Sequence, residues 1–151
     1  MPYWKLNYHI VWGTKDRQPF LTAEIEPIVY GFIRSKVAGL EGTLYAANGW
    51  VDHVHLVVSI PPKISVATFI GQVKGVTTAR YNKSSECRTP IYWQEEYSVF
   101  SFDEKRLPNY VDYVARQKIH HAQGTLIKIL EYIEPGEVHK IGEEPVEYFS
   151  L

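Results

Sequence analysis

The sequence predicts an α+β fold of the ferredoxin-like, or RRM-like, class, in which helices pack on the faces of a four-stranded antiparallel sheet. Strand-like and helix-like patterns follow one another in the order β-α-β-β-α-β-α. The strand-like segments are rich in β-branched and aromatic residues, and the helix-like segments repeat apolar residues every three to four positions. With 151 residues, of which 45% are hydrophobic, we expect residues 1–151 to form one domain with a sizeable core.

The first half of the chain supplies three strands and one helix. Residues 4–14 are aromatic and β-branched, which is typical of a strand. Residues 23–40 place apolar side chains at helical spacing, with glycines at the end of the segment. Residues 43–50 and 51–60 are predicted to be two further strands, joined as a hairpin through Asn48-Gly49.

The second half is expected to hold two long helices, one strand and a short last helix. Apolar residues at helical spacing predict a helix over residues 65–81, and residues 91–102 have the composition of a strand. A third helix is predicted over residues 108–122. Pro108 can occupy its first turn, where proline is tolerated. The apolar stretch 126–133 follows, and an acidic tail begins at about residue 134.

The charge of the chain is unevenly distributed. The formal net charge is −1, which argues against a protein that coats duplex DNA with a broad basic face. Residues 1–121 hold 14 Lys and Arg against 11 Asp and Glu, whereas residues 122–151 hold 2 against 6. A weakly basic body with an acidic tail suits a protein that handles a short stretch of nucleic acid, and it suits a generic enzyme nearly as well.

Other classes of protein are disfavoured by composition. No apolar run approaches the roughly 20 residues of a membrane span, and the first residues do not resemble a signal peptide. Cys87 is the only cysteine, which rules out an intrachain disulfide and a cysteine-based zinc site. We therefore expect a cytoplasmic protein without a membrane partner.

A His-x-His motif in the third predicted strand is the first candidate for chemistry. Alternate side chains of a strand share a face, so His53 and His55 lie on the same side of the sheet. Two imidazoles at this spacing can bind one metal ion, although a specific site needs a third ligand from elsewhere in the chain. A pair of half-exposed strand histidines without a metal would give the same pattern.

The helix over residues 108–122 offers that ligand. Tyr110, Tyr113, Gln117, His120 and His121 form one stripe along it, and residues four apart are neighbours on a helix. Gln117 could thus complete a His-His-Gln set, and Tyr113 could present a nucleophilic phenol to the same point. An aromatic stripe that only packs in the core would have the same spacing.

Together these motifs resemble the single-tyrosine HUH transposases of bacterial and archaeal insertion sequences and their relatives, the REP-associated tyrosine transposases. Each motif is weak alone, but their order and spacing along most of the chain are specific. The segments that carry the resemblance are residues 8–15, 52–59, 61–65 with 73–75, 93–94 with 97–101, and 113–117 with 120–121.

The resemblance implies an activity and its residues. His53, His55 and Gln117 would bind a divalent ion, Mg²⁺ or Mn²⁺, and Tyr113 would attack single-stranded DNA. The products would be a 5′-phosphotyrosine and a free 3′-OH, later rejoined to another strand as in DNA transposition. Among the basic residues, four are expected to contact DNA: Lys15, Arg17, Lys74 and Arg80.

The resemblance also implies partners. The DNA would contain a hairpin, and the protein would act at the nucleoid as a homodimer. Because the segment from Ser101 to Leu107 looks flexible, the tyrosine helix could dock on its own sheet or on a partner's. The resemblance favours the partner, which would give composite active sites.

Other functions share some of these features. A non-catalytic nucleic-acid-binding module of the same fold would need solvent-facing aromatics on the central strands, on which bases could stack. A domesticated protein would keep the DNA-binding fold and serve the host in another process. A two-histidine phosphoesterase would need a second His-x-Ser/Thr strand motif. The other histidines (His9, His120, His121 and His139) do not supply one.

Overall fold

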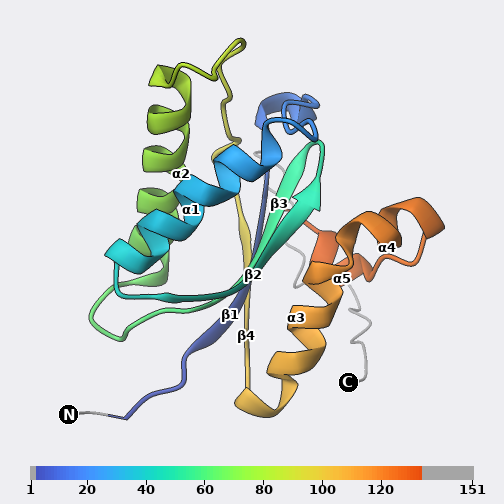
Figure 1. Ribbon diagram of the computed structural model, residues 1–151. Helices are drawn as coiled ribbons and strands as arrows, with labels where there is room; N and C mark the ends of the chain where they lie inside the picture. Colours follow the sequence, from blue (N-terminus) through green and yellow to red (C-terminus); the bar gives the residue numbers. More distant parts are fainter. Residues whose placement is uncertain (1–2, 134–151) are drawn as a thin grey trace.

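The computed structural model describes residues 3–133, so the predicted acidic tail from about residue 134 lies outside the described residues. Four antiparallel strands form one sheet in the order β2-β3-β1-β4 (Figure 1). They are β1 (Asn7–Gly13), β2 (Thr43–Trp50), β3 (His53–Ser59) and β4 (Ser98–Phe102). This order is that of a ferredoxin-like sheet, which confirms the predicted fold class.

Helices cover both faces of the sheet (Figure 1). Helices α1 (Glu26–Gly39) and α2 (Val66–Lys83) pack against each other on one face. The other face carries α3 (Leu107–Ala115), α4 (Gln117–Gln123) and α5 (Lys128–Glu131). Two short 3-10 helices precede the first and third helices: η1 (Lys15–Arg17) and η2 (Glu104–Arg106). Within residues 3–133, no helix has both the length and the apolar character needed to cross a membrane.

The central strand β3 is buried over its whole length. Val54, Leu56 and Val58 point into the larger hydrophobic core, under α1 and α2. Val57, on the opposite face, packs in a second cluster with Val114 and with residues of α3 and α5. Because successive side chains alternate between faces, His53 and His55 lie on the α3–α5 side with Val57.

The turn between β2 and β3 lies at Val51 and Asp52, so the predicted hairpin turn at Asn48-Gly49 is wrong. Both of those residues belong to β2, and the Asn48 amide instead donates to the Ala115 carbonyl at 3.0 Å. Gly49 lies so close to the His53 carbonyl oxygen that a side chain would collide with it. Here glycine permits a close approach of two backbones rather than a turn.

The predicted strand over residues 91–102 is regular only in β4, from Ser98 onward. The Lys74 ammonium accounts for much of this difference, because it attracts three successive carbonyls. It donates to the carbonyl oxygens of Gln94 at 2.7 Å, Glu95 at 3.0 Å and Glu96 at 3.4 Å. In a regular strand, successive carbonyls point alternately to the two neighbouring strands. Three successive carbonyls that all point at one cation therefore cannot belong to a regular strand. Upstream, only an isolated bridge between Thr14 and Trp93 continues the sheet.

The predicted helix over residues 108–122 is two helices, with the break at Arg116. Arg116 has φ −101° and ψ 20°, outside helical geometry, and no proline or glycine marks the position. The change of direction lets α4 follow the end of β2, where the Lys118 ammonium donates to the Gly49 carbonyl at 2.7 Å. The short helix predicted over residues 126–133 is α5, which is limited to residues 128–131.

The close approach at Gly49 predicts a stability difference between two glycines. We expect Gly49→Ala to lower the free energy of unfolding by about 1–3 kcal/mol, because the new methyl group would overpack the His53 backbone. Gly31→Ala is the control, since nothing lies within 4 Å of a side chain added there, and it should stabilise α1 by up to about 1 kcal/mol. Urea denaturation measures both, and equal effects would contradict the close approach.

Candidate metal and tyrosine site

The two histidines of β3 direct their Nε2 atoms at one carboxylate oxygen. Glu131, at the end of α5, places Oε1 3.2 Å from Nε2 of His53 and 3.0 Å from Nε2 of His55. Both imidazoles are nearly inaccessible to solvent, and the Glu131 side chain is 15% exposed. Strand β3 and helix α5 therefore build one face of the site together, across 76 residues of sequence.

The second oxygen of Glu131 contacts side chains of both α3 and α4. The Tyr113 hydroxyl donates a short hydrogen bond to Oε2, and the Gln117 amide donates to the same atom at 3.2 Å. The Tyr113 oxygen also accepts a hydrogen bond from the Ile127 backbone N–H at 3.0 Å. The four residues singled out from the sequence, namely His53, His55, Tyr113 and Gln117, thus surround a fifth that was not.

The geometry of this cluster fits a divalent ion. One ligand atom each from His53, His55 and Glu131 can be chosen within 4.8 Å of one another. Ligand atoms about 2.1 Å from an octahedral ion lie roughly 3.0 Å apart, close to the separations of 3.0 and 3.2 Å between Glu131 and the two histidines. Gln117 Oε1 is buried and has no hydrogen-bond partner among the described residues, so it is available as a further oxygen ligand.

His53 is held by an acidic neighbour. Its Nδ1 lies 2.7 Å from Oδ1 of Asp52, so Nε2 is the nitrogen directed at the site. Burial raises the pKa of Asp52, but the hydrogen bond with His53 and the nearby Arg17 guanidinium outweigh burial and lower it to about 2. Asp52 is therefore ionised at neutral pH, and a carboxylate behind a histidine is a common way to orient a metal ligand.

A third histidine approaches from α4. His121 places its Nε2 3.2 Å from Nε2 of His53 and 3.7 Å from Oε1 of Glu131. Its ring stacks on Trp50 at the end of β2, with 4.8 Å between ring centroids and 9° between planes. The stacking fixes His121 at the rim of the site.

The site keeps its groups in different protonation states. Burial lowers the pKa of His55 to about 4, so this imidazole is neutral at pH 7. Burial acts the same way on His53, but its hydrogen bonds with Asp52 and Glu131 raise the pKa above its ordinary value. The bonds from the histidines outweigh burial at Glu131 and lower its pKa, whereas burial and the Glu131 anion raise the pKa of Tyr113. Glu131 is thus an anion beside a protonated phenol.

The four basic residues expected to contact DNA fall on different sides of the molecule. Lys15 and Arg17 are exposed in η1, where Arg17 Nη2 lies 3.4 Å from Asp52, beside the histidines. Lys74 and Arg80 belong to α2, on the opposite face of the sheet. The three ammonium protons of Lys74 are matched by the three carbonyls of residues 94–96, and Arg80 lies over the Phe32 ring. The structure therefore places Arg17 beside His53 and Asp52, and none of the described side-chain contacts brings Lys15, Lys74 or Arg80 to the site.

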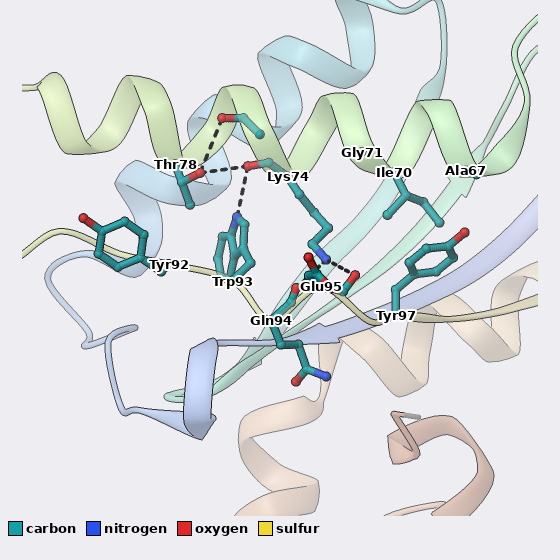
Figure 2. A pocket seen from close by; sticks show the side chains of 11 residues that line it. Ala67, Ile70, Gly71, Lys74, Thr78, Tyr92, Trp93, Gln94, Glu95 and Tyr97 are labelled. Atoms are coloured by element: carbon teal, nitrogen blue, oxygen red, sulfur yellow. Dashed lines mark hydrogen bonds between the residues drawn. The ribbon is translucent and has the colours of Figure 1, made fainter. Parts of the chain in front are cut away.

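A separate hollow of about 370 Å³ lies between α2 and residues 92–97 (Figure 2). Lys74 reaches across it to the opposite backbone, and Trp93 donates from its indole nitrogen to the Lys74 carbonyl at 3.1 Å. Burial lowers the pKa of Lys74 to about 8. These contacts tie the 92–97 segment to α2, which gives the lysine a structural role in the described arrangement.

Glu131 is the site residue that the sequence did not indicate. It belongs to a helix of four residues, 14 positions beyond Gln117, in a segment marked only by its apolar composition. A carboxylate between apolar residues Leu130 and Tyr132 is the available signal, since a charged residue within a buried stretch usually has a partner.

Comparison with known proteins agrees with the resemblance read from the motifs. The family model described as "Transposase IS200 like" matches residues 2–117. The chain is 33% identical over 72 residues to the transposase for insertion sequence element IS200 of Salmonella typhimurium, covering 48% of this chain and 47% of that protein. It thus spans about half the length of that relative. It is 24% identical over 121 residues to the ISDra2 transposase TnpA of Deinococcus radiodurans, covering 76% of this chain and 85% of that protein.

Two solved structures share the fold. A putative transposase from Deinococcus radiodurans superposes with a TM-score of 0.61 at 24% identity, covering 77% of this chain and 93% of that chain. A REP-associated tyrosine transposase bound to a REP hairpin superposes with a TM-score of 0.60 at 14% identity, covering 97% of each chain. On the match over residues 2–117, the chain belongs to the family of IS200-like transposases.

Proposed function

We propose that this chain is a metal-dependent transposase that cuts and rejoins single-stranded DNA through a covalent bond to Tyr113. The observation that supports the proposal is the arrangement of His53, His55, Tyr113 and Gln117 around the Glu131 carboxylate. This cluster joins a potential metal-ligand set to a potential nucleophile. An aromatic stripe that served only to pack the core would need no histidines and no carboxylate beside the tyrosine.

The proposed metal ligands are His53, His55 and Glu131, with the Gln117 amide oxygen as a fourth. An ion held by these residues would supply positive charge that neutralises the scissile phosphate and orients it for attack. Two imidazoles favour Mn²⁺ over Mg²⁺, because nitrogen is a softer ligand than oxygen. The neutral state of His55 and the ionised state of Glu131 suit this role without further proton loss.

Tyr113 is the proposed nucleophile. Its phenol oxygen forms a bond to phosphorus, the bond from phosphorus to the 3′ oxygen breaks, and the 3′ oxygen leaves as a hydroxyl. The phenol proton passes to water as the bond forms, and the leaving oxygen takes up a proton. Burial and the hydrogen bond to Glu131 raise the pKa of the phenol, so Tyr113 is protonated in the described arrangement and loses its proton only as it attacks. The phosphotyrosine conserves the energy of the phosphodiester, so rejoining needs no ATP.

Hairpin-containing single-stranded DNA is the proposed partner, and the nucleoid in the cytoplasm the proposed place of action. The support comes from the structural neighbour that is bound to a REP hairpin, together with family membership. Arg17 lies beside His53, where it could contact DNA, and Lys15 is exposed two residues before it in η1. DNA contacts by Lys74 and Arg80 stay a prediction, and would have to occur on the opposite face of the sheet.

A module that binds nucleic acid by stacking bases on its sheet is disfavoured by the burial of the central strands. Every residue of β3 is buried, as is all of β1 except Tyr8, which packs partly against the core. Base stacking needs aromatic side chains on a solvent-facing sheet surface, and helices cover both faces of these strands. A domesticated member of the family would use the site around Glu131 instead.

The metal site predicts a specific loss of ion binding. Calorimetry should find one Mn²⁺ site per chain, and the His53→Ala/His55→Ala double variant should lose it, because both imidazoles are removed. Glu131→Gln should weaken binding at least about 10-fold, since a neutral amide replaces the anionic ligand. Affinity of the unaltered chain should fall with falling pH, because protons compete for His53, whose pKa is raised.

The control for Glu131 is Glu104→Gln. The Glu104 carboxylate also accepts a hydrogen bond from another side chain, the Asn7 amide, at 2.7 Å, but it belongs to η2 and has no contact with the histidines of β3 among the described residues. Glu104→Gln should bind Mn²⁺ like the unaltered chain. Equal affinity of the unaltered chain and the double histidine variant would contradict the site.

The nucleophile predicts a difference between two tyrosines on the same helix. Incubated with hairpin-containing single-stranded DNA and Mn²⁺, the unaltered chain should form a covalent adduct that survives a denaturing gel. Tyr113→Phe keeps the ring but removes the attacking oxygen, so it should lower adduct by at least about 1000-fold. Tyr110→Phe, one turn earlier and stacked on Phe102, should retain it. The reverse pattern would show that Tyr113 is not the nucleophile.

A homodimer with composite sites predicts complementation between inactive chains. In the described chain Tyr113 meets its own histidines, and exchange of α3–α5 between two chains would keep those neighbours. A Tyr113→Phe chain mixed with a His53→Ala/His55→Ala chain should regain adduct, found only on the size-tagged histidine variant. If confirmed heterodimers never form adduct, each chain builds its site from its own residues.

A further inference from the structure

One buried polar side chain beside the site has no part in the proposed chemistry. His9, in the middle of β1, has no solvent exposure and lies on the same face of the sheet as His55. Its Nε2 is 2.9 Å from Nδ1 of His55, and the ring centroids are 5.0 Å apart. Phe100 in β4 and Tyr110 in α3 enclose the ring, at centroid distances of 6.4 and 5.9 Å.

An imidazole is a costly choice at this position. His9 Nδ1 is buried and lacks a hydrogen-bond partner among the residues that the structure describes. An unsatisfied polar atom in the interior costs about 1–3 kcal/mol, and a phenylalanine would fill the same space between aromatic rings without that cost. The one contact that phenylalanine could not make is the hydrogen bond to His55.

That hydrogen bond controls which nitrogen of His55 is available to an ion. A neutral imidazole carries one proton, so Nε2 of His55 has a lone pair only when Nδ1 carries the proton and donates it. Asp52 accepts such a bond from His53 at 2.7 Å, and His9 occupies the corresponding place behind His55. Each histidine of β3 thus has its Nε2 toward Glu131 and its Nδ1 toward a separate partner.

We infer that His9 is a positioning residue of the metal site, which accepts the Nδ1–H of His55 and so directs the Nε2 lone pair at the ion. The inference rests on the proposed metal binding by His53, His55 and Glu131. A neutral partner suits this deeper position, because an acid behind His55 would add a second buried anion close to Glu131.

His9 is suited to the state without an ion as well. There His55 Nε2 can donate to Oε1 of Glu131 at 3.0 Å, so its Nδ1 must accept, and His9 must donate from Nε2. Imidazole can donate or accept at the same nitrogen by changing tautomer, and the glutamine amide can do so by rotating. Phenylalanine can do neither, which separates hydrogen bonding from packing in a test.

Mn²⁺ calorimetry on three variants tests the inference. His9→Phe should weaken Mn²⁺ binding by about 10–100-fold, the usual effect of losing a partner behind a metal ligand, and His9→Gln should restore most of it. Asn7→Leu is the matched control: Asn7 is a buried polar residue on the same strand and face, but its amide donates to Glu104. It should keep the affinity of the unaltered chain even if it lowers stability.

The outcomes separate this inference from the proposed function. Unaltered affinity in His9→Phe, or an equal loss in Asn7→Leu, would overturn the role of His9 while leaving the metal site in place. A failure of the unaltered chain to bind Mn²⁺ would overturn both. If His9→Phe does not fold, an NMR spectrum of the histidine ring nitrogens tests the inference on the unaltered ¹⁵N-labelled chain with bound Zn²⁺. We expect Nδ1–H on both His55 and His9, and a proton on His9 Nε2 would overturn the inference.

Discussion

The site depends on one largely buried carboxylate that must be compensated by its neighbours. An ionised group removed from water costs several kcal/mol unless hydrogen bonds and charges replace its hydration. Glu131 receives hydrogen bonds from His55, Tyr113 and Gln117, which come from three different elements. This single group therefore fixes the sheet, the tyrosine helix and α4 relative to one another. Its interactions specify the site's geometry as much as they stabilise it.

The sheet supplies the rigid half of this arrangement. Strand β3 is paired on both edges, with β1 and β2, and each of its faces is buried against helices. A slip of one residue would exchange His53 and His55 with Val54 and Leu56, placing imidazoles in an apolar core and aliphatic side chains in the site. The cost of both errors makes the register, and with it the direction of the two ligands, strongly specified.

The sequence predicted those features that follow from local periodicity. The fold class followed from the order of patterns, and the common face of His53 and His55 from the two-residue period of a strand. What it missed depends on contacts between distant segments. The turn at Val51 and Asp52 requires the close approach at Gly49, and the irregular 91–97 segment requires the Lys74 ammonium. Neither leaves a mark in the local pattern.

Contacts between distant segments also determine the site residues that the sequence did not indicate. The pairing of Tyr113 with Gln117 assumes one continuous helix, but the helix is interrupted at Arg116. A carboxylate 14 residues beyond Gln117 forms hydrogen bonds with both side chains instead. Glu131 could not be found from spacing, because no helical or strand period relates it to either partner. His9 lies within a strand whose pattern has no unusual feature, and the pairing of β1 with β3 brings it behind His55.

The contacts that hold α4 in place also bear on how a dimer could form. The Lys118 ammonium donates to Glu26 at 2.6 Å and to Asn48 Oδ1 at 2.8 Å, and so fastens α4 to α1 and β2. These contacts join segments on either side of the short connection through η2, residues 104–106. Exchange of α3–α5 between two copies replaces each contact by an identical one, so it changes the path of the connection and not the packing energy. A dimer built in this way would therefore retain the Lys118 anchor and the Glu131 cluster, with the same geometry at both sites.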